Sequence, residues 1–188
     1  MNKLLFVVAL SVATTVVSAQ KLSGNLSPLK GQKEVNVVID FSGTLVNGQA
    51  NESHIAYFSR GKNEEETAKW LKEWNEDMPN DSYTQLIKYL SVEAKNKGFT
   101  VGDFPSAEYT IRVTVINISP GAHLTKNSDV KSKVSFVKTG ENTPFATVEY
   151  KKTRSKSSSW FPSQVTRTAM AFGSLGSVIG KTISKDLK

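Results

Sequence analysis

Three segments in the second half of the chain alternate apolar and polar residues, and this pattern constrains the fold more than any other feature. The segments are residues 109–115, 130–136 and 146–150. Because successive side chains of a strand point to opposite faces, each segment predicts a strand with one apolar and one polar face. Residues 139–144, TGENTP, join the last two strands as a hairpin. The sequence therefore predicts a sheet that is covered on one side and open to water on the other.

Helices are expected before and after these strands. A capping box at Asn63 begins the first helix, and Pro79 is expected to end it. A second capping box at Ser82 begins the next helix, and Gly98 is expected to cap its C-terminus. The last helix spans about residues 163–187 and carries a stripe of small residues. Since each glycine costs a helix about 1 kcal/mol relative to alanine, this stripe predicts close packing against a neighbour.

One strand precedes the helices and completes the expected fold. Residues 35–41 carry apolar side chains on both faces, which is typical of a central strand. Residues 42–62 are rich in Gly, Asn and Ser and are expected to form a long loop. The order β-α-α-β-β-β-α predicts an α+β two-layer sandwich, a mixed sheet of about four strands with helices packed on one face. The first strand is expected to pair in parallel with a later one.

The first 19 residues are typical of a secretory signal peptide. A basic start at Lys3 precedes the apolar run from Leu4 to Val17, and small residues favour cleavage between Ala19 and Gln20. The run is shorter than the roughly 18 apolar residues that a membrane span needs. We therefore expect export to the periplasm or the extracellular space, with no transmembrane segment in the mature chain. A lipid anchor on cysteine is excluded, because the chain contains no cysteine.

The mature chain is expected to form a single domain preceded by an arm. Residues 20–34 are mostly polar and are interrupted by glycine and proline, so we expect a flexible N-terminal arm. Residues 35–188 are long enough for one α+β domain. The absence of cysteine excludes thiol nucleophiles and cysteine-based zinc sites. His54 and His123 fall in expected loops and are expected to be exposed to solvent. Because they lack partners at metal-binding spacing, we expect no metal and no cofactor.

The excess of positive charge lies in the C-terminal part of the chain, where residues 106–188 carry 13 basic and 5 acidic side chains. The candidate binding surface combines cations from the polar strand faces with residues of the following loop. It consists of Arg112, Lys131, Lys133, Lys151, Arg154 and Trp160. Its expected partner is an anionic envelope component or another envelope protein, and an exported protein is not expected to bind nucleic acid. The alternative is a solvated face whose lysines discourage aggregation.

Residues 37–48, VVIDFSGTLVNG, resemble the phosphate-transferring motif of the haloacid-dehalogenase family, in which D-x-D-G-T-L follows an apolar strand. The resemblance implies that Asp40 is a nucleophile. Ser42 stands where the family has its second Asp, and a serine can form a hydrogen bond but cannot act as the acid. The family also needs an acidic pair to hold magnesium, and the expected position offers only Glu141. A phosphatase-like hydrolase that uses Asp40 and Ser42 is therefore the alternative function.

A second resemblance extends over most of the mature chain. It is carried by the segments LKGQKEVNVVIDFS, NEEETAKWLKEWN and GFTVGDFPSAEYTIRVTV, together with the tripeptide SPG. These segments resemble a group of small secreted proteins of unknown function from Bacteroidetes-type Gram-negative bacteria. The resemblance implies export and an α+β domain, and it brings no catalytic residues. The leading hypothesis is a non-enzymatic binding or envelope-associated module.

Overall fold

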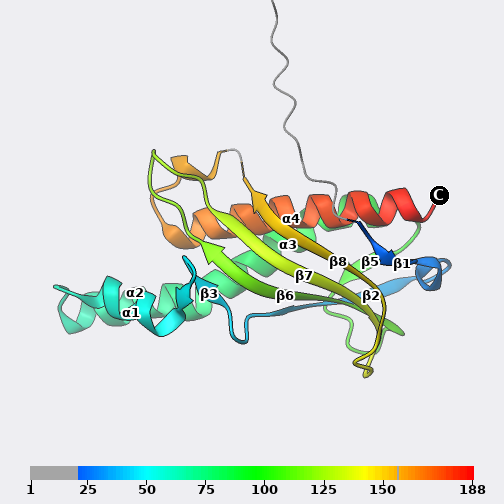
Figure 1. Cartoon of the computed structure of the whole chain (residues 1–188), viewed down its shortest axis with the longest axis horizontal. Helices are drawn as coiled ribbons and strands as arrows, with labels where there is room; N and C mark the ends of the chain where they lie inside the picture. The colour runs from blue at the N-terminus through cyan, green and yellow to red at the C-terminus, as the bar shows by residue number, and fades with distance from the viewer. Residues whose placement is uncertain (1–20, 156) are drawn as a thin grey trace, which may run out of the picture.

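Within residues 21–155 and 157–188, which the computed structural model describes, eight strands form one mixed sheet. The strands are β1 (Ser23–Gly24), β2 (Glu34–Asp40), β3 (Leu45–Val46), β4 (Gln49–Ala50), β5 (Thr100–Gly102), β6 (Tyr109–Ser119), β7 (Asp129–Lys138) and β8 (Pro144–Arg154). The α-helices are α1 (Asn51–Ser59), α2 (Glu64–Lys72), α3 (Met78–Asn96) and α4 (Gln164–Asp186). The shorter helical turns are η1 (Ser27–Leu29), η2 (Glu73–Asp77) and η3 (Ser158–Trp160). Helices α3 and α4 lie behind the sheet, and α1 and α2 project from one end (Figure 1).

The predicted signal peptide, residues 1–19, and its cleavage site between Ala19 and Gln20 lie outside the described residues. Across the described residues, no helix combines the length and the apolar character required to cross a bilayer.

The predicted sandwich with about four strands is wrong, because the sheet contains eight. The main path runs β1-β8-β7-β6-β2-β5, and β3 and β4 extend the sheet beside the end of β6. Four strands escaped prediction because β1, β3, β4 and β5 have only two or three residues each. Alternation cannot show in so short a segment, so these strands exist only through pairing with distant parts of the chain.

The expected loop over residues 42–62 is also wrong. This segment forms the small hairpin of β3 and β4 and then α1. Asn47 and Gly48 turn the hairpin in the left-handed region, with φ of 53° and 79°. The backbone N–H of Asn47 donates to the carbonyl of Ile118 at 2.8 Å, which attaches the hairpin to β6. The predicted order of elements therefore lacks a helix and two strands between β2 and α2.

Pro79 does not end a helix, contrary to expectation. Residues 64–96 are helical throughout, with the π-helical turn η2 between α2 and α3. Proline has no N–H to donate, and its ring crowds the carbonyl four residues earlier. In the turn before Pro79, the N–H of Met78 donates to the carbonyl of Glu73, five residues back. This wider turn lets Pro79 enter the first turn of α3, where a missing N–H is tolerated.

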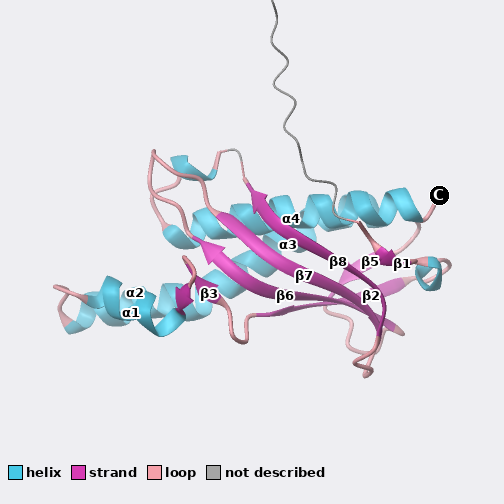
Figure 2. Cartoon of the chain, viewed as in Figure 1, coloured by secondary structure: helices cyan, strands magenta, loops and turns pink. Residues whose placement is uncertain are grey.

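The core lies between the sheet and the two long helices. Strand β2 pairs in parallel with β6, as expected for the first predicted strand, with Val37 in register with Ile111. The same face of β7 contributes Phe136, and α4 contributes Phe172 and Ile179. All of these side chains are buried. No helix of the described residues lies over the opposite face of β6, β7 and β8 in Figure 2.

The stripe of small residues on α4 lies against α3, as predicted. A Cβ atom added at Gly176 would lie 2.3 Å from the carbonyl oxygen of Leu86. At Gly180 it would lie 2.8 Å from Cβ of Glu93. The two backbones therefore approach to a distance that only glycine permits.

The segment expected to be a flexible arm is tied to the core over residues 21–34. Leu26 and Leu29 are buried in the main hydrophobic cluster. Strand β1 pairs with β8, and the backbone N–H of Leu26 donates to Asp186 Oδ2 at 2.7 Å. The start of the described chain is thereby joined to the last turn of α4.

Candidate functional site

Asp40 lies at the end of β2, where the chain leaves the sheet. Its Oδ1 accepts a hydrogen bond from the backbone N–H of Ser42 at 2.9 Å. This is an Asx turn, which Gly43 continues with φ of 70°. In the described residues, no group of three or more His, Cys, Asp or Glu side chains is placed to hold a metal ion. The bond to Ser42 assigns Asp40 a structural role in the turn, and this geometry gives the phosphatase-like alternative no support.

The sheet register places most of the predicted binding residues on the open face. Arg112 is in register with Val38 on β2 and with Ser135 on β7. In the next row of this face, Asp40 is in register with Thr114, which faces Lys133. Lys133 in turn faces Glu149 on β8. This row of the open face therefore carries two carboxylates, Asp40 and Glu149, and one cation, Lys133.

A bulge in β8 brings Lys152 to the open face. Strict alternation along the sequence would place Lys152 on the buried face, with Tyr150. Val130 pairs with Thr153 and Ser132 pairs with Tyr150, so Lys131 lies opposite both Lys151 and Lys152. An extra residue of this kind shifts the alternation of the strand by one position. As a result Lys152 reaches Asp129 Oδ2, with its Nζ 3.6 Å away. The break in alternation after Tyr150 is the signal that could have identified Lys152.

Carboxylates neutralise part of the predicted surface. Lys131 Nζ lies 3.6 Å from Glu149 Oε1, and both side chains are largely exposed. Arg154 Nη2 lies 3.2 Å from Asp129 Oδ2, the oxygen that Lys152 also reaches. Two of the predicted cations therefore have an acidic partner, and Asp129 is shared by two cations.

The other cations of the open face have no such partner. Within residues 21–155 and 157–188, no carboxylate lies within 4.0 Å of Arg112, Lys133 or Lys151. Arg112 Nη1 donates only a long hydrogen bond, 3.4 Å, to Asn142 Oδ1. Lys133 and Lys151 are exposed. These three residues carry the unneutralised positive charge of the surface.

Trp160 lies apart from the strand residues, in η3 after β8. Its side chain is 72% exposed. The backbone beside it is tied to the loop between β6 and β7, because Leu124 N–H donates to the carbonyl of Ser159 at 2.6 Å. Leu124 is 61% exposed. The sequence identified Trp160 as a candidate but gave no reason to place Leu124 beside it.

An aromatic cluster of His54, Phe58, Trp70 and Trp74 holds the projecting helices α1 and α2 together. The rings of Phe58 and Trp70 stack at 5.5 Å, and those of Trp70 and Trp74 stack at 5.9 Å. Trp74 Nε1 donates to Asn51 Oδ1 at 2.9 Å. The two tryptophans thus serve as packing residues, and Trp74 is buried.

His54 is the buried titratable group of this cluster. Its ring centroid lies 4.7 Å from that of Trp74 and 4.7 Å from that of Phe58. Burial lowers the pKa of His54 and the side chain of Gln164 opposes that shift, but Nε2 of His54 has no hydrogen-bond partner among the described residues. His54 was expected to be a solvent-exposed loop residue, and the structure instead buries it in a helix.

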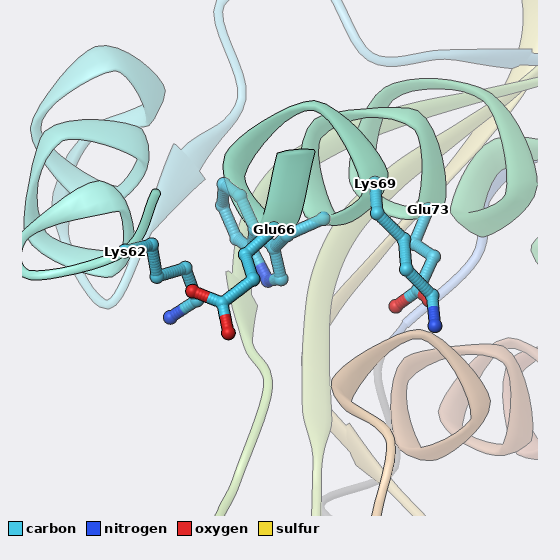
Figure 3. A pocket seen from close by; sticks show the side chains of 5 residues that line it. Lys62, Glu66, Lys69 and Glu73 are labelled. Atoms are coloured by element: carbon cyan, nitrogen blue, oxygen red, sulfur yellow. The ribbon is translucent and has the colours of Figure 1, made fainter. Parts of the chain in front are cut away.

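Two hollows lie near this cluster. The larger is an open groove of about 340 Å³ with two lysines and two glutamates along it, so its lining has no net charge. In Figure 3 Lys62 and Glu66 lie at one end and Lys69 and Glu73 at the other. The smaller hollow, about 150 Å³, lies between Phe41 and Trp74. Pockets for typical small-molecule ligands measure about 300–1,000 Å³, so the smaller hollow falls below that range.

No family model matches the chain, and no curated protein matches it. A solved structure of a PelC dodecamer from Paraburkholderia phytofirmans has a TM-score of 0.45 and 7% identity, covering 84% of this chain and 96% of that one. A single-substitution variant of the same dodecamer gives 0.46 and 8%, covering 90% and 98%. TM-scores below 0.5 at this identity transfer neither a fold family nor a function to this chain.

Proposed function

We propose that this protein is an exported, non-enzymatic binding module that associates with an anionic component of the cell envelope. The observation that carries the proposal is that Arg112, Lys133 and Lys151, on a sheet face that no described helix covers, have no ion-pair partner among the described residues. Side chains held in register on adjacent strands present their charges at fixed spacing, which favours a polymeric or extended anionic partner.

The surrounding residues support the proposal. Lys152 and Arg154 share the single carboxylate of Asp129, so this group retains a net positive charge. Lys131 is paired with Glu149, and reversing its charge would also unpair that carboxylate. Lys133 and Lys151 are therefore better test positions than Lys131.

The test compares binding to heparin, used as a defined polyanion without a bilayer, and binding to an anionic envelope fraction. The variant is Lys133→Glu/Lys151→Glu. The matched control is Lys95→Glu/Lys181→Glu, which makes the same change of charge at exposed positions on α3 and α4.

We expect the sheet variant to elute from heparin at clearly lower salt than the wild type and the control variant. Surface attractions are screened within about 10 Å at 0.1 M salt, so binding through this face should also weaken steeply with ionic strength. Equal elution of the two variants would show that retention follows net charge alone and would refute the role of the open face.

A further inference from the structure

The two loops at one end of the sheet carry exposed apolar side chains at adjacent positions. We call residues 120–128 and 155–163, without residue 156, the two-loop platform. Trp160 is 72% exposed and Leu124 is 61% exposed. The hydrogen bond from Leu124 N–H to the Ser159 carbonyl places Leu124 next to the residue that precedes Trp160. Two large apolar side chains thus project into solvent from neighbouring loops.

Hydrogen bonds between the loops fix the platform. Ser128 N–H donates to Ser158 Oγ at 2.7 Å, and Ser159 N–H donates to Asn127 Oδ1 at 2.9 Å. Leu124 is held at φ of 59°, a left-handed conformation that a large side chain rarely adopts. Such a conformation persists only where the surroundings impose it, and it is found most often at functional positions.

Arg167 of α4 holds both loops of the platform by hydrogen bonds to their backbones. Its side chain is only 3% exposed. Nε donates to the Pro120 carbonyl at 3.0 Å, and Nη1 donates to the carbonyls of Phe161 and Pro162 at 2.7 and 2.6 Å. Burial lowers the pKa of Arg167, but an arginine keeps its charge at neutral pH. One buried guanidinium therefore joins the two loops to the helix and to each other.

The two loops of the platform carry no acidic side chain. Residues 120–128 and 155–163 contain no Asp or Glu. His123 and Lys126 are exposed on the first loop. Arg154 and Lys152, at the entry to the second loop, share one carboxylate between them.

We infer that the two-loop platform docks on an anionic lipid bilayer, with Trp160 and Leu124 entering the interface. Tryptophan favours the level of the lipid headgroups, because its ring is apolar and its N–H is polar. Each Lys or Arg close to an anionic bilayer adds to the attraction. A platform held rigid before contact loses little freedom when it binds. The inference rests on the export in the proposed function. Its apolar side chains, Trp160 and Leu124, lie outside the open sheet face, whereas Lys152 and Arg154 adjoin both surfaces.

The experiment measures binding of the full chain to large vesicles of phosphatidylethanolamine and phosphatidylglycerol in a 7:3 ratio, by co-sedimentation. The test variants are Trp160→Ala and Leu124→Ala. The controls are Tyr57→Ala and Val92→Ala, which remove apolar side chains that are 65% and 59% exposed outside the platform. Thermal unfolding followed by circular dichroism checks that each variant is folded.

Fluorescence provides a readout specific to the platform. The chain has three tryptophans, and Trp70 and Trp74 are held in the aromatic cluster. A blue shift and quenching by brominated lipids that disappear in Trp160→Ala would therefore report on Trp160.

We expect Trp160→Ala to weaken vesicle binding about tenfold, as the loss of a large apolar contact predicts, and Leu124→Ala to weaken it less. Tyr57→Ala and Val92→Ala should bind like the wild type. Wild-type binding by Trp160→Ala, or no quenching of Trp160 by brominated lipid, would overturn the inference. Because heparin offers no bilayer, a failure of the platform would leave the open-face test on heparin unaffected.

Discussion

Substitution of Gly176 by alanine tests how closely α3 and α4 pack. An alanine in a helix is favoured over glycine by about 1 kcal/mol, so the local effect alone would stabilise the protein. The added Cβ would lie 2.3 Å from the Leu86 carbonyl oxygen and 3.1 Å from its carbonyl carbon. Both atoms belong to the backbone of α3, which cannot rotate away as a side chain can. The helices must therefore separate by about 1 Å to restore ordinary van der Waals contact.

Overpacking of a core typically costs about 1–3 kcal/mol, and a backbone obstacle places Gly176→Ala at the upper end. After subtraction of the gain in helix propensity, we expect the free energy of unfolding to fall by about 2 kcal/mol. For a chain of this size, such a change lowers Tm by roughly 4–8 °C. The assay is urea unfolding followed by circular dichroism, with the midpoint and the slope fitted separately.

Two neighbouring glycines supply matched controls on the same helix. A Cβ at Gly173 would meet the ring of Tyr89 at 2.9 Å, and one at Gly180 would meet the side chain of Glu93 at 2.8 Å. The ring of Tyr89 can rotate away, whereas Cβ of Glu93 is fixed to the backbone of α3 and only the rest of that side chain can move. We expect Gly173→Ala to change stability by less than about 1 kcal/mol, and Gly180→Ala to lie between Gly173→Ala and Gly176→Ala. An increase in stability for Gly176→Ala, or an equal loss in all three variants, would refute this account of the packing.

Three further predictions concern single side chains. Asp40→Ala should lower stability by about 1 kcal/mol by removing the acceptor for the Ser42 N–H, whereas Asp40→Asn keeps an acceptor. An equally large loss in Asp40→Asn, measured by urea unfolding, would contradict the turn role. Because burial lowers the folded-state pKa of His54 below 6.5, its contribution to stability is complete above pH 6.5 and falls as the pH drops toward the folded-state pKa. His54→Leu should remove this part of the pH dependence between pH 7.5 and 5, and an unchanged profile would exclude His54 as its source. Arg167→Met should cost about 2–4 kcal/mol, because three carbonyl oxygens lose their buried donor; a loss below about 0.5 kcal/mol in thermal or urea unfolding would show that the guanidinium does not hold the loops.

The sequence alone determined the long elements of the fold. Alternation located β6, β7 and β8, and apolar periodicity located the long helices, because these signals repeat over many residues. The capping box at Asn63 correctly marked the start of α2. The one predicted at Ser82 was wrong, because α3 begins at Met78 and Ser82 lies inside it. The stripe of small residues on α4 correctly predicted close packing, although it could not identify Leu86 as the contact. The polar faces of the three strands likewise predicted the open face and most of its cations.

Structural features that depend on residues far away in the chain could not be predicted from the sequence. Strands β1, β3, β4 and β5 are too short to show a period, and they exist because neighbouring strands offer hydrogen bonds to them. In the sequence, Pro79 predicts the end of a helix. Only the structure shows the π-helical turn that lets the helix continue past it.

For the candidate surfaces too, some features followed from the sequence and others only from the tertiary structure. The sequence supplied Lys133, Lys151 and Trp160 because charge and exposure follow from residue type and from position in a strand or a loop. The tertiary structure decided which charges remain unneutralised, since the partners of Lys131 and Arg154 lie on other strands. It also joined Leu124 to Ser159, the residue before Trp160, by a backbone hydrogen bond. This bond connects loops more than 30 residues apart. Arg167, a residue of a third segment, holds both loops by hydrogen bonds that no local pattern encodes.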